Sequence, residues 1–385
     1  MNYIDAELPA SGTTVLVGMS GGVDSTLTAL MLKEKGCRVI GITMSLWDGS
    51  LASHKDSCQL NTSCFGPGEE SNIAECRAFC EANQIEYHVI DVKSEYRREV
   101  IDYFKNEYRS GRTPNPCIRC NSKVKFYALL KGVEKLGIQY DYFCTGHYAK
   151  IVRPETGLYG TDVRPCMIAG AVDASKDQTY FLYRVPSEIL EKVRFPLASL
   201  KKTEVVALAE KAQLAAAKRA ESQDFISGEY LDMLFSDKPS VSGDILDLDG
   251  KVIGKHRGIE FYTIGQRRGL GVAVNYPVYV HSIDAKNNII VLASNDQLNS
   301  SALIAEDFVW PGEIEPPESF KALVKIRLAS KPAEALVEKI EGSGSSAKWK
   351  VTFDMPQRAV APGQSAVFYK DGVIIGGGII SEPLK

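Results

Sequence analysis

The sequence predicts an α/β protein in which a doubly wound parallel sheet precedes a small central β-rich domain and a C-terminal antiparallel β-barrel. Apolar strand patterns alternate with amphipathic helix patterns up to Gly111, as in strands joined by crossover helices. From Gly243 the pattern changes to short strands, and beyond Leu298 strands alternate with glycine-rich turns, which is typical of a small barrel. We therefore expect three domains, at residues 1–204, 205–297 and 298–385.

The individual elements follow from the same periodicities. Val15–Met19 is a short apolar strand, and the apolar residues after it fall at helical spacing until Gly36. A helix is expected from Asn72 to Asn83, because Asn72 and Glu75 have the spacing of a capping box. The remaining expected elements are strands 38–44, 86–92 and 141–148, helices 94–110, 200–214 and one starting near 122, an extended segment 166–172, and barrel strands 324–328, 335–340, 348–353, 365–369 and 372–375.

The loop between the first strand and the first helix reads Ser20-Gly-Gly-Val-Asp-Ser25. Gly21 and Gly22 let the backbone approach an anion closely, and the helix that follows offers unpaired N–H groups and a positive dipole end. It is not a Walker A loop, because no Gly-Lys-Ser/Thr follows. Asp24 beside phosphates favours a Mg²⁺ ion between them. The loop resembles that of the PP-loop ATPases, which split ATP into AMP and pyrophosphate by adenylating a carbonyl oxygen.

Composition describes an ordinary globular protein. The 385 residues are 44% hydrophobic and 24% charged, with a formal net charge of −3, so the chain is not a general nucleic-acid binder. There is no apolar run of membrane-spanning length and no signal-peptide pattern at the start. We therefore expect a cytoplasmic protein without membrane association. Nine cysteines, an odd number, favour metal, cluster or thiol chemistry over a disulfide framework.

Basic residues gather around a proline-rich segment. Between Lys105 and Lys125 the acidic residue is Glu107, and the basic residues are Lys105, Arg109, Arg112, Arg119, Lys123 and Lys125. Arg267 and Arg268, between glycines, form a second basic loop. Such runs are either solvated faces or RNA contacts, and their place beside the Pro-Asn-Pro loop favours RNA.

Cys117 and Cys120 form a Cys-x-x-Cys pair between prolines and a helix. Such a pair can be a redox couple, half of a zinc site or two ligands of an iron–sulfur cluster. A further thiolate could come from Cys64, Cys76 or Cys80, although each could equally be a small buried hydrophobe.

The order of several motifs identifies a family. After the PP-loop come Thr113–Asn121, Thr145–Tyr148, Lys176–Leu182, Tyr262–Leu270 and Ala361–Tyr369. In this order, over nearly its whole length, the chain resembles the tRNA-specific 2-thiouridylases, the MnmA family. The resemblance implies that ATP adenylates the 2-position oxygen of the wobble uridine of tRNA, and that sulfur then displaces AMP.

The resemblance also implies roles by position. Cys120 would be the nucleophile that handles sulfur, and Cys117 would share in catalysis with Asp24. The ATP site would comprise Gly18, Met19, Ser20, Gly21, Gly22, Val23, Asp24, Ser25, Met44 and Gly146. Asn115, Pro116 and Cys117 would border the target base, and His147, Lys176, Asp177, Gln178, Arg327 and Gln364 would contact tRNA. The barrel and central domain would clamp the anticodon arm. The sulfur donor would be sulfide or a persulfide-carrying protein such as a cysteine desulfurase.

Two departures from the family pattern affect the sulfur step. Many relatives have an aspartate in the position of Cys117, and a second catalytic cysteine in the loop that matches Glu221–Gly228, which has no cysteine here. A disulfide-forming relay therefore cannot be transferred intact. This favours a 4Fe-4S cluster on Cys117, Cys120 and a third cysteine, with Cys64 and Cys80 ahead of Cys76, and zinc as the rival metal.

Other functions remain open from the sequence. A PP-loop ligase that forms an amide on a small molecule would explain the loop but neither the cysteine pair nor the barrel. The chain could also thiolate a different pyrimidine in another RNA, or bind RNA with a vestigial ATP site. RNA-stimulated release of AMP and pyrophosphate separates these alternatives.

Overall fold

The computed structural model describes residues 2–49, 65–66, 68–218 and 228–385. The chain forms two compact units. The first comprises residues 1–99, 117–231 and 371–374, and the second comprises residues 100–116, 232–370 and 375–385. Among the described residues, no helix is both long and apolar enough to cross a membrane.

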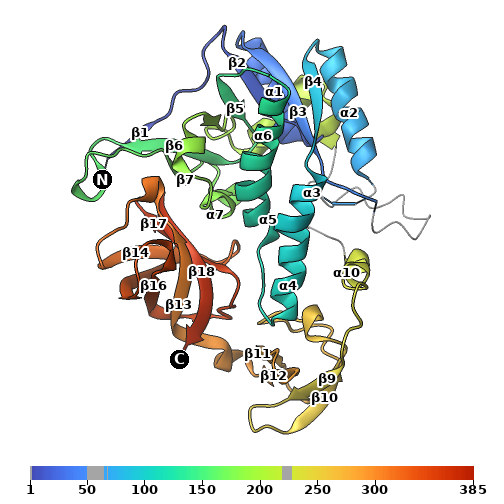
Figure 1. Ribbon diagram of the computed structural model, residues 1–385, viewed down its shortest axis with the longest axis vertical. Coiled ribbons are helices and arrows are strands. Elements are labelled where there is room, and N and C mark those ends of the chain that lie inside the picture. The colour runs from blue at the N-terminus through green and yellow to red at the C-terminus, as the bar shows by residue number, and fades with distance from the viewer. Residues whose placement is uncertain (1, 50–64, 67, 219–227) are drawn as a thin grey trace. The chain divides into compact units, whose positions relative to one another are not determined.

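A parallel sheet forms the centre of the first unit (Figure 1). Its strand order is β4-β3-β2-β5-β8, and every neighbouring pair is parallel. The strands are β2 (Thr14–Gly18), β3 (Arg38–Ser45), β4 (Glu86–Asp91), β5 (Tyr142–Cys144) and β8 (Val193–Arg194). From β2 the chain continues to β3 on one side, while β5 pairs on the other. The carboxyl ends of β2 and β5 therefore form a topological switch point, where doubly wound sheets bind ligands.

Helices and a second set of strands complete this unit. The helical elements are α1 (Val23–Glu34), α2 (Glu69–Ala82), α3 (Lys93–Tyr96), α5 (Pro116–Arg119), the π-helical segment Cys120–Ala128, α6 (Leu129–Lys135), α7 (Thr179–Leu182), α8 (Ser187–Leu190), α9 (Lys202–Lys211) and α10 (Gly228–Leu234). Strands β1 (Tyr3–Asp5), β6 (Ala149–Pro154) and β7 (Met167–Gly170) pair antiparallel. The prediction of a doubly wound sheet is confirmed.

The second unit combines helix α4 and the end of α10 with two β structures. Helix α4 (Tyr103–Arg109) follows the π-helical segment Arg97–Asp102. A four-stranded sheet has the order β10-β9-β12-β11, from β9 (Gly243–Leu246), β10 (Val252–His256), β11 (Tyr279–Asp284) and β12 (Ile289–Ala293). The barrel strands are β13 (Asn299–Val309), β14 (Ser319–Lys325), β15 (Ala333–Glu341), β16 (Lys348–Arg358), β17 (Ser365–Lys370) and β18 (Val373–Leu384). Pairing of β17 with β18 closes the barrel, so the predicted barrel is confirmed.

Local details differ from the sequence prediction where distant contacts decide them. Helix α2 begins at Glu69 rather than Asn72, because the Glu69 carboxylate accepts hydrogen bonds from the backbone N–H groups of Leu46 and Trp47 at 2.8 and 2.9 Å. The prediction that a capping box at Asn72 starts this helix is therefore wrong, because Asn72 lies inside α2. Strand β13 was missed, and β18 extends well beyond Ile375, because pairing in the barrel, not local pattern, sets strand length.

Candidate active site

The loop after β2 is a compact, internally bonded turn at the switch point. Gly21 has φ +75°, a left-handed conformation that glycine adopts at little cost. The Ser25 hydroxyl donates to the Gly22 carbonyl at 3.1 Å and lies 3.2 Å from both the backbone nitrogen and the hydroxyl of Ser20. The loop is thus held in shape just before the N-terminus of α1, which attracts anions.

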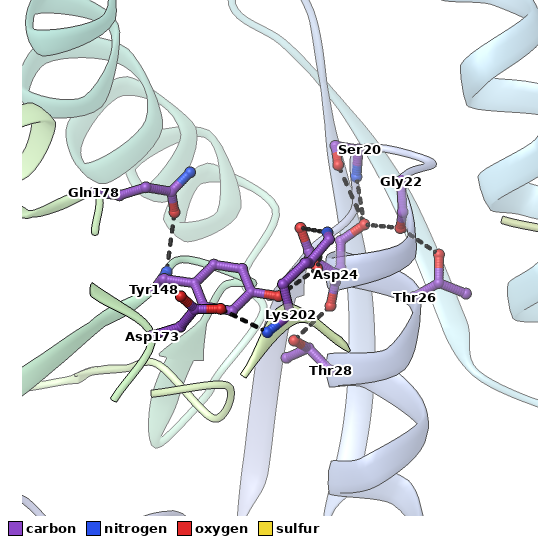
Figure 2. Close-up of polar contacts among 10 residues, drawn as sticks. Ser20, Gly22, Asp24, Thr26, Thr28, Tyr148, Asp173, Gln178 and Lys202 are labelled. Carbon is purple, nitrogen blue, oxygen red and sulfur yellow. Dashed lines mark hydrogen bonds and ion pairs between the residues drawn. The ribbon is translucent and has the colours of Figure 1, made fainter. Parts of the chain in front are cut away.

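Asp24, in the first turn of α1, lies between two side chains from other elements (Figure 2). The Lys202 ammonium lies 2.7 and 2.9 Å from the two carboxylate oxygens, and the Tyr148 hydroxyl donates to one of them at 3.0 Å. The Lys202 side chain is 14% exposed and that of Asp24 is 30% exposed. A partly buried pair of this kind is less screened by water than a surface ion pair.

Packing and backbone bonds place Lys202 over Asp24. Lys202 is the first residue of α9, and its backbone N–H donates to the Asp173 carboxylate at 2.8 Å. That bond, together with those from Ser175, holds the pKa of the Asp173 carboxyl below its ordinary value. One apolar cluster joins α1 to α9 through Leu27 and Val205, and it also contains Tyr148 and Leu197. Neither Lys202 nor Asp173 was predicted from the sequence, because no local motif connects them to Asp24.

The segment after β5 forms the other side of the loop. A Cβ atom at Gly146 would lie 2.8 Å from the Asp24 backbone and Cβ, so only glycine allows this approach. Gln178 accepts a hydrogen bond from the Tyr148 N–H at 2.9 Å through its side chain and donates its own N–H to the Tyr148 carbonyl at 3.2 Å. Gln178 therefore fixes Tyr148, which in turn contacts Asp24 (Figure 2).

His147 is held neutral within this segment. Its Nδ1 lies 2.7 Å from the Thr145 hydroxyl, and its Nε2 lies 3.5 Å from the Lys125 ammonium. The rings of Phe126 and Phe195 lie 5.9 and 5.7 Å from the imidazole. Burial, with the positive charge of Lys125, lowers the pKa of His147 well below its ordinary value. The neutral imidazole of His147 can therefore form a hydrogen bond with a nucleobase, but it carries no positive charge at neutral pH.

Other predicted ATP-site residues lie along the same edge of the sheet. Gly18 is the last residue of β2, and Met44 is next to last in the adjacent β3. Met44 is half-buried, whereas Val23 is buried in the protein. The carboxyl ends of both strands thus face the loop that carries Ser20 and Asp24.

Cys117 and Cys120 lie three residues apart on a continuous helical segment. Cys117 is in α5, and Cys120 begins the π-helical segment that follows. Both are partly exposed, and spacing of three residues places them on neighbouring positions of one helix face. Next to them, the Asn121 side chain donates to the Phe181 carbonyl at 3.2 Å. The pair is therefore accessible on an anchored helix.

Among the described residues, no third thiolate is grouped with this pair. Cys80 and Cys76 lie on α2 within an apolar core cluster, and burial raises the pKa of the Cys80 thiol to about 12. Cys64 lies outside the described residues. Over the described ranges, no three His, Cys, Asp or Glu side chains are grouped to hold a metal ion.

The basic run from Lys105 to Lys125 is largely engaged in ion pairs. Lys105 and Arg109 both contact the Asp237 carboxylate, at 2.8 and 2.7 Å. These partners, Arg109 foremost, hold the pKa of Asp237 far below its ordinary value. Arg112 pairs with Glu107 at 2.8 Å, and Arg119 pairs with Glu99 at 3.2 Å. Less charge is available for RNA than the residue count suggests.

The remaining predicted RNA contacts lie in separate places. Lys176 ends a short 3-10 turn, and Asp177 accepts the Thr179 N–H at 2.8 Å. Arg327 donates to the Arg358 carbonyl at 3.3 Å in the barrel. Asn115 and Pro116 close the proline-rich segment. Gln364 donates to the carbonyls of Thr113 and Pro114.

Comparisons with known proteins cover nearly the whole chain. Residues 13–227 match the family model described as tRNA methyl transferase HUP domain, residues 231–294 the tRNA methyl transferase PRC-barrel domain, and residues 300–380 the aminomethyltransferase beta-barrel domain. A solved 4-thiouridine synthetase in complex with RNA and ATP aligns with 58% of this chain and 49% of its own at 15% identity, with a TM-score of 0.28, too low to carry an argument.

Curated relatives are much more similar. The tRNA-specific 2-thiouridylase MnmA of Endomicrobium trichonymphae is 42% identical over 369 residues, which are 95% of this chain and 98% of the relative. Those of Chloroflexus aurantiacus and Carboxydothermus hydrogenoformans are each 40% identical, over 96% of this chain and 98% of the relative. The chain therefore belongs to the MnmA family of tRNA-specific 2-thiouridylases.

Proposed function

We propose that this protein is an ATP-dependent tRNA sulfurtransferase that converts the wobble uridine to 2-thiouridine and releases AMP and pyrophosphate. Its membership of a family whose curated relatives are named tRNA-specific 2-thiouridylases supports this function. The main structural support is that the same chain has two features. One is a loop suited to phosphate binding, with Asp24 and Lys202 paired beside it, and the other is a partly exposed Cys-x-x-Cys pair.

The loop and its neighbours would perform the ATP half of the reaction. Backbone N–H groups around Gly21 and Gly22 would bind the phosphates, and Asp24 would supply an oxygen ligand for Mg²⁺. The uridine O2 would attack the α-phosphorus, so that an O–P bond forms while the bond to pyrophosphate breaks. Lys202 would offset the negative charge that develops on the departing pyrophosphate.

The cysteine pair would perform the sulfur half. The sulfur nucleophile that attacks C2 of the adenylated uridine would be either sulfide itself, held beside Cys120, or the outer sulfur of a Cys120 persulfide received from a persulfide-carrying protein. The C–S bond forms, the C–O bond breaks, and AMP leaves with the former uridine oxygen. In the persulfide route the Cys117 thiolate would then attack Cys120, so that the S–S bond breaks, 2-thiouridine is released, and an external thiol reduces the resulting Cys117–Cys120 disulfide. Cys117 would act with Cys120, either as a second thiol or as a co-ligand of a 4Fe-4S cluster or zinc ion that requires a further ligand.

The anticodon arm would contact residues spread along the chain. Asn115 and Pro116 would border the extruded base, whose removal from the stack costs a few kcal/mol. Lys176 and Arg327 supply positive charge for phosphates, and neutral His147 supplies a hydrogen bond. Each of these assignments is a position to be tested by substitution.

One experiment tests the proposal against its alternatives. Purified protein is incubated anaerobically with Mg-ATP, sulfide and a tRNA transcript that carries a wobble uridine, and digested nucleosides are analysed by mass spectrometry. The control is the same transcript with cytidine at the wobble position. We expect 2-thiouridine and equimolar AMP from the first transcript alone. AMP formation that needs no RNA would favour a small-molecule ligase, and thiolation of the control would favour another pyrimidine.

A further inference from the structure

One barrel loop is bonded to the backbone that precedes the cysteine pair. The Gln364 side-chain nitrogen donates to the carbonyls of Thr113 and Pro114, each at 3.1 Å. The Thr113 N–H in turn donates to the Pro362 carbonyl at 2.7 Å. Three hydrogen bonds therefore join residues 362–364 to residues 113–114, within one compact unit.

The proline-rich segment needs such outside partners. Pro114 and Pro116 have no backbone N–H, so residues 113–116 have only two backbone donors, on Thr113 and Asn115. Residues 113–115 lie in neither a helix nor a strand, yet their carbonyl groups must be paired where they are shielded from water. Gln364 supplies two of those pairings with a single amide group.

The barrel loop is itself rigid. The Gly363 N–H donates to the Ile380 carbonyl at 2.8 Å, and the Ile380 N–H donates to the Gln364 carbonyl at 2.8 Å. Gly363 has φ +91°, and a Cβ atom there would lie 2.9 Å from both the nitrogen and the oxygen of Thr113. Glycine is therefore required both for the turn and for the close approach of the two backbones.

We propose that Gln364 and Gly363 are positioning residues, which hold the Thr113–Asn115 backbone in place for the target base. This inference rests on the proposed function and gives Gln364 a role inside the protein that is distinct from the tRNA contact that the family resemblance implies. The Gln364 amide is already committed to Thr113 and Pro114, and RNA could use its nitrogen only by breaking those bonds. The barrel thereby contributes directly to the geometry of the base site.

The test compares two isosteric substitutions on the barrel. Gln364→Glu keeps the size of the side chain but replaces its donor with a carboxylate that faces two carbonyls. The matched control is Gln357→Glu, because the Gln357 amide donates only within its own strand, to the Met355 carbonyl at 2.8 Å. Single-turnover thiolation at saturating tRNA, tRNA affinity by filter binding and melting temperature are measured for both.

We expect Gln364→Glu to slow thiolation by about 10- to 100-fold, because a small displacement of the reacting groups lowers the rate by factors of this size. The tRNA affinity and the melting temperature should match those of the control. Weakened tRNA binding with an unchanged saturated rate would overturn the inference and restore the RNA contact. A rate loss explained by a lower melting temperature would also overturn it.

Amide hydrogen exchange gives a readout that needs no RNA or catalysis. In Gln364→Glu and Gly363→Ala, exchange at the Thr113 amide is expected to accelerate by at least about tenfold, because its bond to Pro362 opens more often. Unchanged exchange would refute the anchoring. If the wild-type protein fails to thiolate tRNA, the proposed function falls, while the exchange experiment still decides whether the barrel loop anchors this segment.

Discussion

Removal of the Lys202 charge is the sharpest test of the candidate active site. The ammonium lies 2.7 and 2.9 Å from the Asp24 oxygens, and its side chain is 14% exposed. Lys202→Met keeps most of the aliphatic stem and removes the charge, which lies 5.8 Å from the centre of the Tyr148 ring. A hydrogen bond to a charged group contributes about 1.5–3 kcal/mol, so we expect a loss of stability in the lower part of that range after solvent screening.

The effect on catalysis should exceed the effect on stability. If Lys202 offsets the charge on the departing pyrophosphate, its removal should slow adenylation by about 100- to 1,000-fold. Removal of one hydrogen-bond donor that stabilises the transition state typically lowers the rate by this factor. The assay is release of AMP and pyrophosphate at saturating ATP and tRNA, with melting temperature measured in parallel. The control is Lys211→Met, at the exposed end of the same helix.

Two results would refute this reasoning. An unchanged rate of AMP release in Lys202→Met would remove Lys202 from the reaction. If Lys202 only balances the charge of Asp24, the double variant Asp24→Asn, Lys202→Met should recover the activity that either single variant lacks. We expect instead that the double variant is no more active than Asp24→Asn.

Three further outcomes follow from the site. Gly146→Ala should abolish AMP formation, measured directly, because the new methyl group would press on the Asp24 backbone; a rate within twofold of wild type would contradict that contact. Because the folded-state pKa of His147 is lowered, the unfolded chain binds more protons below about pH 6.5, so stability should fall as pH drops from there. His147→Gln should flatten this part of a plot of melting temperature against pH, and an unchanged slope would show that His147 is not buried neutral. Iron and zinc analysis after anaerobic purification should find metal in the wild type and none in Cys117→Ala or Cys120→Ala; full activity of a metal-free wild type would exclude the metal.

Local sequence patterns were sufficient for the elements that local forces determine. The parallel sheet and the Ser20–Ser25 loop could be predicted because their strand periodicity and glycine turn lie within a few consecutive residues. Lys202 could not be, since it is 178 residues from Asp24 in the chain and sits at the start of an ordinary amphipathic helix. Its importance follows only from the packing of α9 against α1.

Non-local pairing also shows that a count of basic residues overstates the positive charge that is available to RNA. Residue counts cannot show that Arg109 pairs with Asp237, 128 residues later. The barrel likewise depends on pairings such as Ala302 with Leu384, which no window of sequence contains. Predictions from periodicity therefore located the elements but not the charges that neutralise one another.

The pairing of these charges changes where RNA affinity should originate. The side chains of Arg109, Arg112 and Arg119 are only 22–26% exposed, and each already contacts a carboxylate. A phosphate would have to compete with that carboxylate, so little net attraction would be gained. Arg267 and Arg268 are instead exposed on a glycine-bounded loop, where each phosphate contact would release counterions at no such cost. We therefore expect the arginines beside the proline-rich segment to stabilise the protein around the proposed base site, and we expect the electrostatic attraction of tRNA to arise from exposed loops.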